Sequence, residues 1–459
     1  MTAIEHVTDW RAAVRAATAH GERFAGAWAS DGAWRAAFTA PGTVRVLSCP
    51  ADHAETIVDL VGAAEWDERE ARDLHGLRFP GHEPHRALVA HPAAGWTTPV
   101  TGDGVHEIAV GPVHAGVIES GHFRFHAVGD RVLLLDPRLF YKHRGLERAA
   151  EGRGPDEALA YAQRACAACA VANTIAYAQA VEEALGLWPD RALRVARTLL
   201  LELERLYNHL HDIGALCSGV GFAPGAMAFA ALKERAQRLN AQLIGHRFLF
   251  GSVAVARGVV ALTAEEAAGA RAGVRALRTD AAAAWRELEF AASLQARLDG
   301  VGVLGREDAE RLGTVGPAAR AAGVRRDVRE DSPRLWFGSF TPAGPLAATG
   351  DVAARLQVRA AEIEATCSAL DEVLSAPVPA GAATARDAVS SLGIGRVESP
   401  RGATTCAVEL AAGRVTRLRL RTASYANWPA VAHAAAGCLL PDFPLINKSF
   451  ELCYACVDR

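Results

Sequence analysis

Two Cys-x-x-Cys pairs, Cys166-Ala167-Ala168-Cys169 and Cys453-Tyr454-Ala455-Cys456, stand at opposite ends of one long stretch of the sequence. Four thiolates in two pairs can hold one soft metal centre. The pairs of a zinc ribbon are only about 15–20 residues apart, so this centre must be assembled by the whole fold, with the second pair brought back to the first. The pattern favours a buried catalytic metal over a local structural clip.

Composition narrows the class of protein. The 459 residues are 50% hydrophobic, enough for two or three domains with a large core. A net charge of −3 without a basic run disfavours a nucleic-acid partner, and nine cysteines, an odd number, favour a reducing compartment. We find neither a signal peptide nor an apolar run of the ~18 residues that span a membrane. We therefore expect a cytoplasmic protein that can dock on a membrane partner.

The pattern of apolar residues predicts four successive regions. Residues 1–95 are typical of a small α/β unit, with helices at 9–27, 51–61 and 66–74 and a strand at 43–47. Alternation over residues 106–140 predicts a β-hairpin or small sheet. Apolar residues at three and four spacing predict a bundle of long helices at 158–187, 190–216, 226–250, 264–298 and 352–374. Near the C-terminus we expect strands at 395–397, 404–410 and 415–420 and a helix at 429–436.

Further motifs accompany the two cysteine pairs. Arg164–Cys169 continues into Ala176-Tyr177-Ala178-Gln179-Ala180-Val181-Glu182, and Phe450-Glu451-Leu452 leads into the second pair. These segments resemble the two metal motifs of nickel-iron hydrogenase large subunits. Residues 202–210 resemble a helix that these enzymes share with the 49-kDa subunit of respiratory complex I. Glu398-Ser399-Pro400-Arg401-Gly402 resembles their active-site arginine motif, and residues 111–115 and 143–147 are similar to their N-terminal motifs.

A separate motif lies near the N-terminus. Residues 66–82, beginning Trp66-Asp67-Glu68-Arg69-Glu70, resemble the signature of the complex I 30-kDa subunit. A 30-kDa-like domain (residues 1–95) fused to a 49-kDa-like catalytic domain (residues 96–459) is the layout of formate hydrogenlyase large subunits, a group 4 membrane-bound hydrogenase type. The resemblance therefore implies an α+β, mainly α fold. A long-helix bundle with small β elements would hold the metal site, and a small α/β domain would precede it in the sequence.

The resemblance also implies a cofactor, a nickel-iron centre whose iron carries CO and cyanide. All four sulfurs bind nickel in this family. By position, Cys169 and Cys456 would also bridge to iron, while Cys166 and Cys453 would be terminal ligands of nickel. The other five cysteines are isolated and are predicted to be small core residues, so no iron–sulfur cluster is expected in this chain.

A second metal is implied beside the first. Glu147 matches a carboxylate that holds a magnesium or iron ion in many members of the family. Those enzymes often end in a histidine ligand, whereas Arg459 stands at that place here and cannot bind a cation. A surface pair of Arg144 with Glu147 is the alternative.

Four more side chains have roles implied by the resemblance. Hydrogen cleavage is heterolytic and needs a base. Arg401 would hold its guanidinium over the open metal position, polarising hydrogen or assisting as a base, and Glu119 would pass protons away from a terminal cysteine. Glu451 keeps a carboxylate where the family usually has aspartate. Asn173 stands where a histidine usually donates to a bridging sulfur, and its amide can still donate one hydrogen bond.

Electrons must reach a buried centre, so partners are required. The resemblance implies a small subunit that carries a [4Fe-4S] cluster, membrane antiporter-like or anchor subunits, and formate dehydrogenase or ferredoxin as electron donor. The protein would then lie peripherally on the inner face of the cell membrane. Two alternatives stay open: a complex I-like subunit without nickel, acting in NADH/quinone-type electron transfer or energy coupling, and an assembly scaffold that binds zinc.

Overall fold

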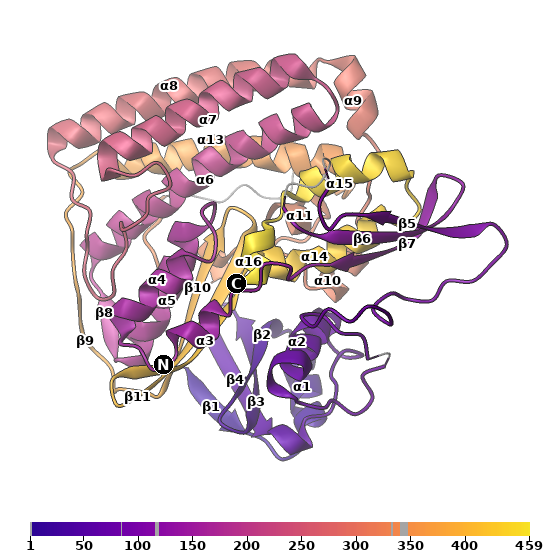
Figure 1. The fold of residues 1–459 in the computed structure, drawn as a ribbon. Coiled ribbons are helices and arrows are strands. Elements are labelled where there is room, and N and C mark those ends of the chain that lie inside the picture. Colours follow the sequence, from indigo (N-terminus) through magenta and orange to yellow (C-terminus); the bar gives the residue numbers. More distant parts are fainter. Residues whose placement is uncertain (1, 84, 115–118, 332–333, 340–347) are drawn as a thin grey trace.

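The computed structural model of the protein describes all residues except 1, 84, 115–118, 332–333 and 340–347 (Figure 1). A four-stranded sheet with two helices lies at the bottom of Figure 1, long helices form the top layer, and a small sheet from the C-terminal part lies between them. The predicted α+β, mainly α fold class is confirmed. The predicted domain boundary near residue 95 stays a prediction.

The N-terminal unit (residues 1–95) has its own core. Its strands follow the order β1-β4-β3-β2, with β1 parallel to β4 and the other neighbours antiparallel. Trp10, Val14, Trp34, Phe38 and Phe79 fill the space between sheet and helices. The elements are β1 (Ala3–His6), α1 (Trp10–Ala19), β2 (Arg23–Ser30), β3 (Ala33–Ala40), β4 (Thr43–Pro50), η1 (Ala51–His53), η2 (Gly62–Ala64) and α2 (Glu65–His75).

Two helix predictions in this unit are wrong. The helix expected over 9–27 ends at Ala19, Gly21 takes a left-handed φ of +76°, and residues 23–30 pair with β3 as a strand. The helix expected over 51–61 is only a short turn at 51–53. Beyond it, the backbone N–H groups of Thr56 and Ile57 donate to the Pro80 carbonyl and the Glu68 carboxylate, so they cannot make helical bonds.

The helix bundle agrees with the periodicity except where helices break. The predicted helices at 190–216 and 352–374 are confirmed as α6 and α13. The predicted helix 158–187 is split in two by residues 164–169, and the predicted helix 264–298 is split near Phe290. The bundle and its neighbours are α4 (Pro155–Gln163), α5 (Ala170–Ala184), α6 (Arg191–Gly219), α7 (Ala223–Ile244), α8 (Ala264–Glu289), α9 (Ala292–Leu298), α10 (Arg306–Arg311), α11 (Gly316–Ala321), α12 (Val328–Asp331) and α13 (Val352–Val373).

Two three-stranded sheets lie beside the bundle. One contains β5 (Val105–Val110), β6 (His122–Val128) and β7 (Arg131–Arg138), which confirms the sheet predicted at 106–140. The other contains β10 (Leu392–Ser399), β11 (Gly402–Ala411) and β12 (Arg414–Arg421), at the strands predicted near the C-terminus. The remaining elements are α3 (Leu146–Ala150), β8 (Leu187–Pro189), β9 (Ala383–Ala385), α14 (Ala423–Ala435), η3 (Leu440–Asp442), α15 (Phe443–Phe450) and α16 (Tyr454–Asp458).

Close packing of α5 on β10 fixes the start of the metal segment. A Cβ at Gly393 would lie 1.9 Å from the Ala180 carbonyl oxygen, and one at Gly395 would lie 1.8 Å from that of Ala176. Every residue of α5 is buried. Because only glycine permits this approach, α5 lies directly on the strand and its first turn, just after Cys169, is held in place.

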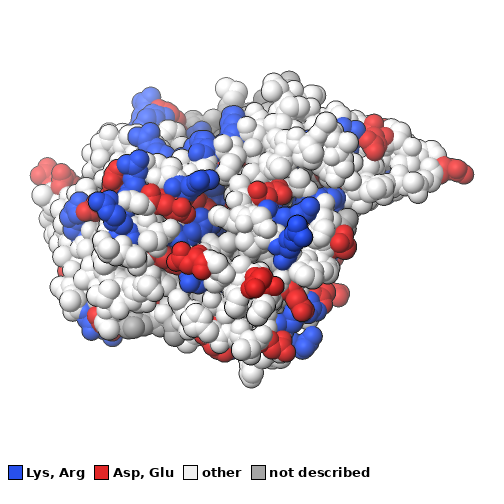
Figure 2. Space-filling view, turned by 60° about the horizontal axis from the view of Figure 1, so that its bottom comes forward, with Lys and Arg blue, Asp and Glu red and all other residues white. Residues whose placement is uncertain are grey.

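The surface carries charges of both signs. Figure 2 shows the face at the bottom of Figure 1, where basic and acidic groups lie next to one another between wide neutral areas. Among the described residues, no helix combines the length and the apolar composition that crossing a bilayer requires.

Candidate metal centre

Four cysteine sulfur atoms meet at the junction of α5 and α16. The Sγ atoms of Cys166, Cys169 and Cys456 all lie within 4.8 Å of one another, and Cys453 Sγ lies 3.2 Å from Cys166 Sγ. Thiolates around one ion with metal–sulfur bonds of ~2.3 Å lie at most ~4.6 Å apart. All four thiols are free. Three of the sulfurs therefore have the spacing of a thiolate metal site, and the fourth, that of Cys453, lies next to Cys166 at its edge.

Short helices and loops position these sulfurs. Cys166 lies in the break between α4 and α5, and Cys169 is the residue before the first turn of α5. The Glu204 carboxylate accepts hydrogen bonds from the backbone N–H groups of Val171 (2.6 Å) and Ala172 (3.0 Å), which fixes that turn. The Cys453 N–H group donates to Ser424 Oγ (3.0 Å). The second pair is thus tied to the start of α14.

The thiols differ in acidity. Hydrogen bonds from Cys166 and Cys456, with a smaller contribution from the charge of Arg401, lower the pKa of Cys169 to about 6. For Cys453, the hydrogen bond with Cys166 and the burial of the thiol raise the pKa to about 12. The Cys169 thiolate is therefore ready at neutral pH, whereas Cys453 and Cys456, whose pKa values are raised, need the charge of a metal ion to lose their protons.

Arg401 lies in the turn between β10 and β11, and each of its three guanidinium nitrogens donates to a fixed acceptor. Nε donates to the Glu451 carbonyl oxygen (2.9 Å), Nη1 to Asn208 Oδ1 (2.8 Å) and Nη2 to Asp212 Oδ1 (2.8 Å). Burial opposes its charge, but Asp212 and the Cys169 thiolate outweigh burial and raise the pKa of Arg401. The guanidinium is a permanent cation beside the sulfurs.

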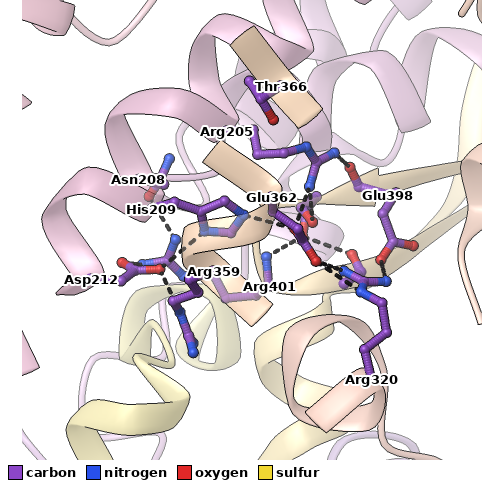
Figure 3. A network of polar contacts seen from close by, with 12 residues as sticks. Arg205, Asn208, His209, Asp212, Arg320, Arg359, Glu362, Thr366, Glu398 and Arg401 are labelled. Carbon is purple, nitrogen blue, oxygen red and sulfur yellow. Dashed lines mark hydrogen bonds and ion pairs between the residues drawn. The ribbon is translucent and has the colours of Figure 1, made fainter. Parts of the chain in front are cut away.

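Behind Arg401 lies a buried network of charged side chains (Figure 3). Asp212 also accepts a hydrogen bond from Arg359 Nε (3.1 Å). The His209 ring lies between two carboxylates, 3.6 Å from Asp212 and 2.8 Å from Glu362. His209 is thus part of a buried ion network.

The network continues away from the sulfurs. Arg320 donates to Glu362 (2.8 Å) and to Glu398 (2.9 Å), and so joins α13 to β10. Burial and the neighbouring Asp327 raise the pKa of Glu398 to about 7, against the opposing charge of Arg320. The position of Arg401 is therefore coupled, through shared ion pairs, to a group that titrates near neutral pH.

The other predicted site residues surround the sulfurs. Glu119 is half-buried, and burial followed by the charge of Cys453 raises its pKa. Glu451 is buried, with Oε1 3.5 Å from His211 Nε2 and with Oε2 lacking a hydrogen-bond partner in the part of the chain that the structure describes. Asn173 is fully buried one turn after Cys169, and both atoms of its amide lack a partner among the described residues. Ala115 and Ile118 of the neighbouring motifs lie outside the described residues.

Glu147 is paired, but not as predicted. The Arg144 guanidinium donates to the carbonyl groups of Arg164, Ala165 and Ala455, so the Arg144–Glu147 surface pair, the alternative to a metal site, is wrong. Glu147 is buried and accepts a hydrogen bond from Arg459 Nε (2.6 Å). A guanidinium lies where a second metal ion would have to bind.

Sequence reasoning missed the partners of Arg401. Asn208 and Asp212 belong to α6, together with Glu202, Glu204 and Arg205, all of them buried. One signal in the sequence could have revealed this network. The helix carries both charged and apolar residues on every side, so some of its charges must be buried, and buried charges need partners.

Comparisons with known proteins agree with this geometry. Residues 220–392 and 391–459 match the family described as respiratory-chain NADH dehydrogenase, 49 Kd subunit; residues 144–218 match nickel-dependent hydrogenase, and residues 36–103 match respiratory-chain NADH dehydrogenase, 30 Kd subunit. The chain is 31% identical to hydrogenase-4 component G and 30% identical to formate hydrogenlyase subunit 5, both of Escherichia coli (strain K12). These alignments cover 88% of this chain and 75% and 76% of the relatives.

Relatives of another kind are also similar. One subunit of the NADH-quinone oxidoreductase of Salinispora arenicola (strain CNS-205) is 30% identical over 76% of this chain and 93% of its own length. Among solved structures, a chain of the membrane-bound sulfane sulfur reductase (MBS), an archaeal respiratory membrane complex, superimposes with a TM-score of 0.71 at 25% identity. The superposition covers 79% of this chain and 100% of the reductase chain.

The fold, the sulfur cluster and these matches define a subunit of the hydrogenase and complex I oxidoreductases. The chain belongs to the group 4, formate hydrogenlyase-type family of nickel-iron hydrogenase large subunits. Within it, a region like the complex I 30-kDa subunit precedes one like the 49-kDa subunit.

Proposed function

We propose that this protein is the catalytic large subunit of a membrane-associated nickel-iron hydrogenase that interconverts hydrogen with protons and electrons. The observation that supports it is the meeting of four cysteine sulfurs from the two ends of the 49-kDa-like region beside a buried arginine. The unpartnered buried amide of Asn173, one turn after Cys169, suits a centre that carries a further hydrogen-bond acceptor.

Each residue of the site has a definite part in this proposal. Cys166, Cys169, Cys453 and Cys456 would hold the nickel-iron centre, which supplies the redox chemistry of hydrogen when bound. Arg401 contributes a fixed positive charge. Because its pKa is raised, it holds its proton, and the electrostatic role is favoured over that of a base.

Proton transfer is assigned to carboxylates. Burial and the charge of Cys453 raise the pKa of Glu119, so it holds a proton more readily than an exposed carboxylate does and can pass it toward the surface. Glu451 is the second carboxylate of the site, and its backbone carbonyl holds Arg401 Nε (2.9 Å).

The proposed setting is a larger assembly. The described part of the chain contains one cluster of metal-ligating cysteines, so electrons need a partner subunit with a [4Fe-4S] cluster. We also propose membrane antiporter-like or anchor subunits and a formate dehydrogenase or ferredoxin donor, with the chain peripheral on the inner face of the cell membrane.

Metal analysis of the purified complex tests the proposal. We expect nickel and iron together, with infrared bands from CO and cyanide bound to iron. Zinc in place of nickel would identify a structural four-cysteine site, and a complex with neither metal would refute the hydrogenase assignment.

A second candidate is a complex I-like subunit that works without nickel in NADH/quinone-type electron transfer or energy coupling. The similarity to a subunit of an NADH-quinone oxidoreductase and the replacement of histidine by Asn173 favour it. In that case quinone reduction by the complex would continue after the four cysteines are replaced.

A further inference from the structure

The side chain of Arg459 lies between two buried carboxylates. Nε donates to Glu147 Oε1 (2.6 Å), and Nη2 donates to both oxygens of Glu70 (2.7 and 2.9 Å). The exposed fractions are 2% for Arg459, 5% for Glu70 and 8% for Glu147. A guanidinium has five N–H donors and no lone pair for a metal. This cluster therefore does not fit a divalent cation.

Arginines neutralise these carboxylates without a metal. Glu70 also accepts a hydrogen bond from Arg419 Nη1 (2.6 Å), and Glu147 accepts one from the Leu420 N–H group (2.8 Å). Burial alone would raise the pKa of both carboxylates, but the charges of Arg419 and Arg459 outweigh burial and lower the pKa of each. The face of Tyr425 covers the Arg459 guanidinium, whose central carbon lies 4.7 Å from the ring centroid.

The three residues join distant segments. Glu70 belongs to α2 of the N-terminal unit, Glu147 to α3, and Arg459 follows Cys456 by three residues. A buried charge that loses its partner is strongly destabilising, so these segments depend on one another. Asp67 of α2 strengthens the junction by accepting hydrogen bonds from Arg419 (2.8 Å) and Arg421 (3.1 Å) of β12.

We propose that the Arg459 guanidinium is the fixed cation of this cluster. It takes the place of a divalent ion between Glu70 and Glu147, and through it the N-terminal unit holds the segment that carries Cys453 and Cys456. The inference concerns the metal segment of the proposed function, but its readouts do not need nickel, so it can fail or hold independently of the hydrogenase assignment.

The cluster is accessible to a test with added metal. A cavity of about 410 Å³ reaches it and is lined by Glu70, His75, His143, Glu147, Arg417 and Arg459, among others. Mn²⁺ added to the purified complex can be counted by electron paramagnetic resonance. We expect no tightly bound Mn²⁺ in the wild type, and one equivalent in Arg459→His that disappears in Arg459→His/Glu147→Gln.

Two results of the Mn²⁺ titration would overturn the proposal. One is a wild-type complex that binds one Mn²⁺ and loses it on Glu147→Gln. The other is an Arg459→His variant that folds and yet binds none. A wild-type complex that binds no Mn²⁺ tightly supports the proposal without any variant, so this arm of the test stands even if a variant misfolds.

Thermal unfolding tests the holding role. Arg459→Gln should lower Tm by roughly 5 °C or more, because it leaves two buried carboxylates short of a partner. EDTA should leave the wild-type Tm unchanged. The matched control is Arg153→Gln, which removes an exposed pair with Glu157 and should shift Tm by less than about 1 °C. An unchanged Tm in Arg459→Gln, or a wild-type Tm lowered by EDTA in a preparation without nickel, would refute the holding role.

Discussion

Arg401 Nη2 lies 2.8 Å from Asp212 Oδ1, and the two residues are only 4% and 1% exposed. This ion pair joins the turn after β10 to the C-terminal half of α6, two elements that contribute no sulfur ligand themselves. Asp212 is in turn held by Arg359. The guanidinium therefore has one orientation, set by the bundle and independent of any bound group.

Arg401→Lys should abolish most turnover while nickel stays bound. An ammonium keeps the charge but cannot reach Asn208, Asp212 and the Glu451 carbonyl at once, so the charge moves away from the sulfurs. Loss of one fixed electrostatic contact commonly costs about 10²–10³-fold in rate. Hydrogen uptake and nickel content, measured on the same sample, check it. Arg414→Lys, at the exposed end of β12, is the control. Full turnover in Arg401→Lys would refute the electrostatic role assigned to Arg401.

Cys453→Ser should lose nickel altogether. A serine hydroxyl is a harder and far less acidic ligand than a thiol, so the four-ligand set loses one member. Elemental analysis of the purified complex measures the loss. The control is Cys438→Ser, because Cys438 is half-buried and lies outside the sulfur cluster. Nickel at full occupancy in Cys453→Ser would show that this residue is no ligand.

Glu119→Gln should slow turnover by about 10²-fold or more with the metal content unchanged, because the amide keeps the size of the side chain but cannot carry a proton. Proton–deuterium exchange with hydrogen gas measures this step directly. Glu107→Gln is the matched control: Glu107 is an exposed glutamate of β5 paired with Arg124 of the adjacent strand β6. If exchange in Glu119→Gln equals the wild type, protons leave by another route.

Local patterns in the sequence predicted the long helices and the meeting of the two cysteine pairs, because apolar spacing and thiol chemistry are local signals. They did not predict β2 and β3. These strands contain Ala25, Ala27, Ala29, Ala36 and Ala37, and alanine favours helices, so only pairing with neighbouring strands makes them extended.

Long-range ion pairs could not be predicted either. Glu147 pairs with Arg459, 312 residues away, instead of the nearby Arg144. Nothing in a single sequence indicates which of many arginines a buried carboxylate will meet, because the fold decides this pairing. The meeting of the two cysteine pairs was therefore predictable from sequence, and the ion network around them was not.

Gly395→Ala should lower the free energy of unfolding by about 1–3 kcal/mol, the usual cost of overpacking. The added Cβ would lie 1.8 Å from the Ala176 carbonyl oxygen, so α5 would have to move off β10 and carry Cys169 with it. Denaturant unfolding measures the loss. Gly269→Ala on the exposed face of α8 is the control, since nothing lies within 4 Å of its Cβ and stability should hold or rise. Equal stability of the two variants would contradict the close packing.

Glu398→Gln should remove one component of the pH dependence of stability. The pKa of Glu398 is raised to about 7 from an ordinary 4.5, first by burial and then by Asp327. The folded state therefore holds a proton that the unfolded state has released, and the free energy of unfolding falls as pH rises between these values.

Because one pKa unit corresponds to about 1.4 kcal/mol, the wild type should lose up to about 3 kcal/mol between pH 4.5 and 7 from this group alone. Denaturant unfolding of the wild type and of Glu398→Gln across that range measures the effect. The difference between the two curves separates the contribution of Glu398 from that of histidines that titrate in the same interval. A difference curve that stays flat, or rises with pH, would mean that Arg320 keeps Glu398 ionised throughout, and that the network behind Arg401 does not take up protons at this position.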